Sequence, residues 1–186
     1  MDISTSPAGG NATRLRDILV VDDSRANLEA VGRRLTQAGY RPCLCASGAE
    51  ALDRLQGRSF DIVLLDMIMP QMTGVSVLQE IRSMPVTSQL PVIMVTSRGD
   101  PGAVVEALNA GADDHISKPF DFQVLVARME RLVERARSLA ELRASNIALD
   151  ARIARRAIEI GELRERVAEM QVERQRLLDE LDRLSA

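Results

Sequence analysis

The chain has 186 residues, of which 46% are hydrophobic and 27% charged, and its formal net charge is −3. These values fit one globular domain with an appendage, and the lack of a dense basic stripe argues against a nucleic-acid-binding protein. No apolar run approaches the ~20 residues needed to cross a bilayer, so no membrane segment is expected. Residues 1–15 are predicted to be a disordered tail, because they are polar and lack the apolar stretch of a secretory signal.

Residues 16–137 alternate short apolar runs with amphipathic stretches, the pattern of an α/β domain. Four runs are apolar on both faces, as buried parallel strands require: 18–21, 42–45, 62–65 and 92–95; a weaker fifth run covers 115–117. Helical patterns separate the runs at 26–38, 49–56, 75–83 and 104–110, and glycines at 39 and 111 act as C-terminal stops. Five such units predict a doubly wound, five-stranded parallel sheet with helices on both faces.

Two cysteines, Cys43 and Cys45, fall two residues apart in the second predicted strand and should point to the same face. A disulfide between them has poor geometry. A reduced, cytoplasmic protein is therefore expected.

A single long helix is predicted to follow Phe120, because proline is absent and one glycine, Gly161, interrupts the remaining residues. A heptad beginning at Leu139 puts apolar residues at the a and d positions up to residue 184, except at Asn146, Arg156 and Arg174. Branched residues at a with Leu at d favour a parallel dimer, and Asn146 can fix its register by pairing with its twin. Residues 138–186 are therefore predicted to form a dimeric coiled coil continuous with the last helix of the domain. The two arginines and Gly161 are either tolerated defects or places where the coil shifts.

Charged and hydroxyl side chains follow four of the predicted strands. They are Asp22 and Asp23 after the first, Asp66 after the third, Thr96 after the fourth, and Lys118, the only lysine among 24 basic residues, after the fifth. Working groups collect at the carboxyl ends of strands in such sheets, so these side chains should converge. Adjacent carboxylates repel one another unless a cation neutralises them, and hard oxygen ligands suit Mg²⁺.

This combination is suited to phosphoryl transfer. One carboxylate can act as the nucleophile and form an aspartyl phosphate, while an ammonium, a hydroxyl and Mg²⁺ stabilise the charge on the transferred group. Taken singly, Asp22 and Asp23 could equally be a surface pair, and Asp66 could be a helix cap.

Several segments resemble the signature segments of response-regulator receiver domains. They are residues 18–23 (ILVVDD), 64–70 (LLDMIMP), 95–97 (VTS) and 116–120 (ISKPF), with support from Gly74 and from 110–114 (AGADD). The resemblance covers residues 18–137 and implies a flavodoxin-like sheet with strand order 2-1-3-4-5.

The resemblance also implies a metal site and a phosphoacceptor. Asp66 would accept the phosphoryl group. Asp23, Asp66 and the backbone carbonyl of Ile68 would bind Mg²⁺ directly, and Asp22 would act mainly through water.

The remaining implied roles belong to the last two strands. Lys118 would pair with the phosphoryl oxygens, Thr96 would swing its hydroxyl toward them, and Lys118–Pro119 would be a cis peptide bond. Receivers usually place an aromatic residue where this chain has His115, its only histidine. The imidazole either has no special role or serves as a pH-sensitive rotating group.

The implied function is that of a phosphorylated switch and not of an enzyme. Its partner would be a sensor histidine kinase or a phosphotransfer protein, and its output a rearranged coiled-coil homodimer. Two alternatives stay open: the regulatory N-terminal part of a larger signalling enzyme such as a diguanylate cyclase, or a scaffold with a silent receiver. Dehalogenase-type phosphatases share the Asp, Lys and Mg²⁺ but carry a second Asp where this chain has Ile68, and no P-loop motif is present.

Overall fold

The structure is a computed structural model that describes residues 16–97 and 101–184. The described chain divides into two compact units, one up to Arg137 and one from Ser138 onward. The predicted tail, residues 1–15, lies outside the described residues.

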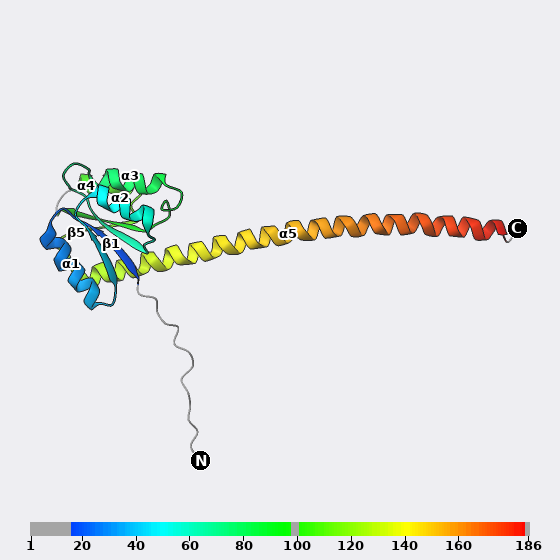
Figure 1. The fold of residues 1–186 in the computed structure, drawn as a ribbon, viewed down its shortest axis with the longest axis horizontal. Helices are drawn as coiled ribbons and strands as arrows, with labels where there is room; N and C mark the ends of the chain where they lie inside the picture. The colour runs from blue at the N-terminus through cyan, green and yellow to red at the C-terminus, as the bar shows by residue number, and fades with distance from the viewer. Residues whose placement is uncertain (1–15, 98–100, 185–186) are drawn as a thin grey trace, which may run out of the picture. The chain divides into compact units, whose positions relative to one another are not determined.

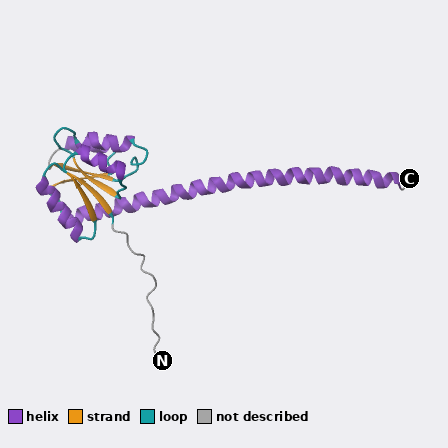
Figure 2. Cartoon of the chain, in the orientation of Figure 1, coloured by secondary structure: helices purple, strands orange, loops and turns teal. Residues whose placement is uncertain are grey.

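The first unit contains a five-stranded parallel sheet with the order β2-β1-β3-β4-β5, which confirms the predicted fold (Figures 1 and 2). The elements are β1 (Asp17–Val21), α1 (Arg25–Gln37), β2 (Arg41–Cys45), α2 (Gly48–Gly57), β3 (Ile62–Asp66), α3 (Gly74–Ser83), β4 (Val92–Ser97), α4 (Pro101–Asn109), β5 (Asp114–Lys118) and α5 (Phe122–Leu184).

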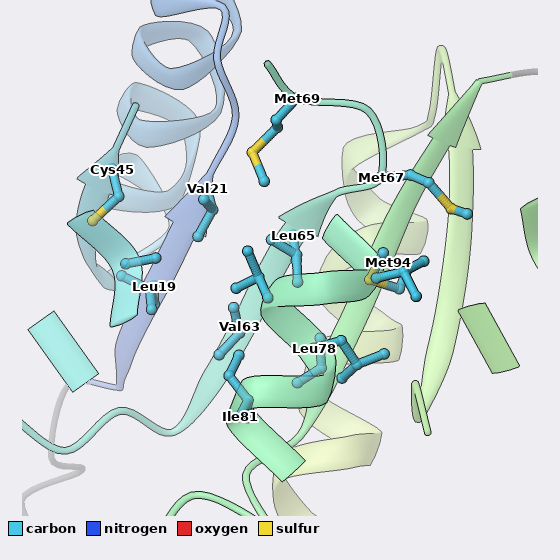
Figure 3. Close-up of a cluster of buried hydrophobic side chains, with 14 of the residues drawn as sticks. Leu19, Val21, Cys45, Val63, Leu65, Met67, Met69, Leu78, Ile81 and Met94 are labelled. Atoms are coloured by element: carbon cyan, nitrogen blue, oxygen red, sulfur yellow. The ribbon is translucent and has the colours of Figure 1, made fainter. Parts of the chain in front are cut away.

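Two layers of side chains cover the sheet because successive residues of each strand point to opposite faces. One face packs against α2, α3 and α4, and Figure 3 shows Val63 and Leu65 of β3 beside Leu78 and Ile81 of α3. The other face packs against α1 and the beginning of α5. The three inner strands β1, β3 and β4 are therefore apolar on both faces, and they fix the positions of the residues that follow them.

Hydroxyl side chains begin the first three helices. Ser24, Ser47 and Thr73 each accept a hydrogen bond from the backbone N–H three residues later, which satisfies a donor that the helix leaves unpaired. The predicted start of α4 at residue 104 was wrong, because α4 begins at Pro101. A proline suits the first turn, where its missing N–H has no partner in any case.

The last helix, α5, runs without interruption from Phe122 to Leu184. Leu125, Met129 and Leu132 are buried against the sheet. From Ser138 onward, the described side chains of the second unit are exposed, and they include large apolar ones such as Leu149. Among the described helices, none combines the length and apolarity required to cross a membrane.

Candidate phosphoacceptor and metal site

Three charged side chains meet at the carboxyl edge of the sheet. Asp22 follows β1, Asp66 ends β3 and Lys118 ends β5. The Lys118 Nζ donates hydrogen bonds to Asp22 Oδ2 and to Asp66 Oδ2, each at 2.7 Å. Because parallel strands end at the same edge, residues 96 positions apart in the sequence are in direct contact.

Asp23 completes a cluster of three carboxylates. Ligand oxygens of Asp22, Asp23 and Asp66 all lie within 4.8 Å of one another. Asp66 is only 9% exposed, whereas Asp23 faces solvent. This cluster offers hard oxygen ligands and is open to solvent on the side of Asp23. It therefore fits Mg²⁺, which binds through one or two carboxylates and keeps several of its waters.

The charge balance of the cluster supports this fit. Burial raises the pKa of Asp66, the ammonium of Lys118 opposes the rise, and the neighbouring carboxylate of Asp22 adds to it. Burial lowers the pKa of Lys118, but its hydrogen bonds and charge contacts with the two carboxylates outweigh burial and raise the pKa overall. A cation beside Asp66 therefore favours the ionised carboxylate that a nucleophile needs.

The backbone around Asp66 is packed tightly against the start of α3. A Cβ added at Gly74 would lie 2.1 Å from the carbonyl oxygen of Asp66, so that only glycine fits there. The Gly74 N–H donates to the Met67 carbonyl at 2.9 Å. The side chain of Ile68, two residues after Asp66, is 66% exposed, and the hydrogen bond from its backbone to the Asp66 side chain lowers the pKa of Asp66.

The predicted switch residues lie on β4 and β5. Thr96 is fully buried, and its Oγ1 lies 3.3 Å from Oγ of Ser117, its partner in the strand register. His115 is half-buried on β5, where its carbonyl accepts a hydrogen bond from Arg128 of α5 at 3.0 Å. The Lys118–Pro119 peptide bond is cis.

Two residues that the sequence interpretation did not single out support Asp22. The Ser24 N–H donates to Asp22 Oδ1 at 2.8 Å, and Asn27 Nδ2 lies 3.2 Å from each oxygen of the same carboxylate. The sequence did carry a signal for this contact, because Asn27 is an amide in the first turn of the helix that follows the aspartate pair. Asn146, the predicted register residue, lies in the second unit and takes no part in this site.

Comparisons with known proteins agree with this geometry. The family model described as the response regulator receiver domain matches residues 18–130. "Response regulator MprA" of Mycobacterium sp. (strain KMS) is 42% identical over 118 residues, which are 63% of this chain and 50% of that protein. The chain thus spans about half the length of the curated relatives it matches.

Solved structures show the same likeness. A putative response regulator from Chloroflexus aurantiacus J-10-fl superimposes with a TM-score of 0.63 and 33% identity, covering 65% of this chain and 99% of that one. A CheY-like response regulator receiver domain protein from Methanospirillum hungatei JF-1 gives a TM-score of 0.62 and 29% identity, with 67% and 98% covered.

Proposed function

Because this chain belongs to the response-regulator receiver family of two-component systems, we propose that it accepts a phosphoryl group on Asp66 from a sensor histidine kinase or a phosphotransfer protein. The observation that carries the proposal is the pair of 2.7 Å contacts from Lys118 to Asp22 and Asp66. They bring a nucleophile, a cation and a second acid to one point from three separate strands. The chain would act as a phosphorylated switch and not as an enzyme with a separate substrate.

The transfer can be described bond by bond. A carboxylate oxygen of Asp66 attacks the phosphorus, a P–O bond forms, and the P–N bond to the donor's phosphohistidine breaks, so that the leaving imidazole keeps the electron pair and takes a proton. The negative charge has then moved from the Asp66 carboxylate to the phosphoryl oxygens, and the Lys118 ammonium pairs with those oxygens. Mg²⁺, held by Asp23, Asp66 and the Ile68 carbonyl, with Asp22 acting through water, would neutralise charge on the same oxygens.

The response would begin at Thr96. For its hydroxyl to reach the phosphoryl group, Thr96 would turn away from the Ser117 hydroxyl on the neighbouring strand β5, which lies 3.3 Å from it. Arg128 connects β5 to α5 through the carboxylate of Asp114 at 2.7 Å and the carbonyl of His115 at 3.0 Å. A shift of β5 would therefore move α5, the helix that continues beyond the first unit. The ring of His115, which lies on β5, is suited to rotate with that shift.

The output would be a rearrangement of a parallel coiled-coil dimer formed by residues 138–184. The heptad places exposed apolar side chains at the a and d positions, among them Ile153 at 58% and Leu142 at 58% exposure. Burying such a stripe against a second copy removes it from water. Asn146 at an a position would set the register of the pair.

The phosphoacceptor is tested by intact-mass spectrometry after incubation with acetyl phosphate and Mg²⁺. We expect one phosphoryl adduct on the wild type and none on Asp66→Asn. An adduct of equal yield on the variant would contradict the assignment of Asp66.

The dimer is tested by analytical ultracentrifugation with a matched pair of substitutions. Ile160→Asp puts a charge at an a position and should yield monomers, whereas Ile158→Asp, at an outward f position of the same helix, should leave the dimer intact. Equal behaviour of the two variants would contradict the assigned seam. Beryllofluoride, which mimics the phosphoryl group, should alter crosslinking within the wild-type dimer but not within Asp66→Asn.

A further inference from the structure

Asn27 is the side chain at the site to which the proposed phosphotransfer gives no role. It lies in the first turn of α1, and its Nδ2 is 3.2 Å from both oxygens of the Asp22 carboxylate. Asp22 accepts two further hydrogen bonds, from the Ser24 N–H at 2.8 Å and from Lys118 Nζ at 2.7 Å. Of these three donors, only Lys118 carries a charge.

The charged donor is also the one that phosphotransfer would remove. Lys118 is shared between Asp22 and Asp66 here, and a phosphoryl group on Asp66 would draw its ammonium away from Asp22. Asp22 is only 6% exposed, so its carboxylate would then need other donors to hold one orientation. Asn27 can hold it without neutralising it, because an amide donates hydrogen bonds but adds no positive charge.

We propose that Asn27 is a positioning residue for the cation: it holds the Asp22 carboxylate toward the cluster, both while Lys118 is shared with Asp66 and after a phosphoryl group draws Lys118 away. The inference rests on the proposed function, because it concerns the cation of that reaction. Hydrogen-bond partners of metal-ligating groups commonly control metal affinity in this way.

The local structure allows this role to be separated from folding. The backbone N–H of Asn27 donates to the Ser24 hydroxyl at 3.4 Å and so takes part in the N-cap of α1. Asn27→Leu keeps that N–H and the approximate side-chain size, and it removes only the two contacts to Asp22. Gln37→Met makes the same kind of change at the exposed end of the same helix and is the matched control.

The test measures Mn²⁺ binding to the full chain by electron paramagnetic resonance of the free ion, with Mn²⁺ as the probe for Mg²⁺. We expect about 3- to 10-fold weaker binding by Asn27→Leu, at or below the usual effect of such partners because Asn27 is solvent-exposed and Asp22 acts through water. Gln37→Met should bind like the wild type. Tyr40 fluorescence during urea unfolding checks that both variants are folded.

A kinetic measurement separates positioning from a general loss of activity. With acetyl phosphate as donor, Asn27→Leu should raise the Mg²⁺ concentration for half-maximal phosphorylation by the same factor and leave the maximal rate unchanged. Equal Mn²⁺ affinity in Asn27→Leu and wild type would overturn the inference and leave the proposed function standing. A wild type that binds no Mn²⁺ would overturn the metal site itself, and the inference with it.

Discussion

The close approach of α3 to the main chain of Asp66 makes Gly74→Ala the most informative stability variant. The added Cβ would lie 2.1 Å from the Asp66 carbonyl oxygen, 2.9 Å from the Met67 Cα and 3.0 Å from the Asp66 carbonyl carbon. All three are backbone atoms, so no rotamer change relieves the contact. Overpacking ordinarily costs about 1–3 kcal/mol, and we expect about 3 kcal/mol here because β3 or α3 must move.

Gly57→Ala is the matched control, since Gly57 ends α2 and, apart from its chain neighbours and its own helix backbone, no atom lies within 4 Å of its added Cβ. That change should be neutral or stabilise the fold by up to ~1 kcal/mol, because alanine restricts the unfolded chain more than glycine does. The assay is urea unfolding followed by fluorescence of Tyr40, which is the only tyrosine in a chain without tryptophan and therefore reports the first unit alone.

The displacement should also reach the site, because the clash falls on the carbonyl of the proposed phosphoacceptor. We expect Gly74→Ala to be phosphorylated more slowly by acetyl phosphate at urea-free conditions, whereas Gly57→Ala keeps the wild-type rate. A Gly74→Ala protein as stable as the wild type and phosphorylated at the same rate would refute the packing argument.

Three further predictions follow from burial and register. Burial and the hydrogen bond to Glu130 raise the pKa of Tyr40 from 10.0 to about 12, so an absorbance titration should show tyrosinate forming near pH 12, and Glu130→Gln should lower that pKa. Iodoacetamide should modify Cys43 alone in the native protein, since Cys45 is fully buried and burial raises its pKa to about 12. Arg156→Leu should raise the melting temperature of the coil, measured by circular dichroism, because it removes a cation from a d position.

Each of these predictions has its own control. Folding favours the neutral phenol of Tyr40, so its raised pKa adds stability that is present below pH 10 and lost as the pH rises toward 12. Tyr40→Phe should remove this loss of stability between pH 10 and about 12. The same pH dependence of stability in the variant and the wild type would contradict the prediction. Both thiols should react in urea, and native modification of Cys45 would contradict its burial. Arg155→Leu, at an outward c position, should leave the melting temperature nearly unchanged, and an equal rise in both variants would argue against the seam.

The sheet and the edge where its site lies could be predicted because both follow from local pattern. Two apolar runs that end in Asp22 and Asp66, and a weaker run that ends in Lys118, give strands whose polar ends must meet once the sheet is parallel. The start of α4 at Pro101 was missed because the apolar periodicity begins three residues later, while the helix itself starts where the proline permits.

Contacts between residues of different elements were not predictable in the same way. The support of Asp22 by Asn27 depends on the direction in which α1 leaves the sheet, and the fit of Gly74 depends on where α3 crosses β3. The proximity of Thr96 to Ser117 depends on strand register, which shifts every facing pair if it slips by one residue. None of these quantities is fixed by the spacing of residues in one segment.

Identification of the phosphorylated residue is the most direct test of the central claim. The protein would be phosphorylated with acetyl phosphate and Mg²⁺ and reduced with borohydride, which converts an aspartyl phosphate to homoserine, and its peptides would be sequenced by mass spectrometry. Homoserine at position 66, and at no other aspartate, is the predicted result. Homoserine at Asp22 or Asp23, with Asp66 unmodified, would contradict the assignment of the nucleophile.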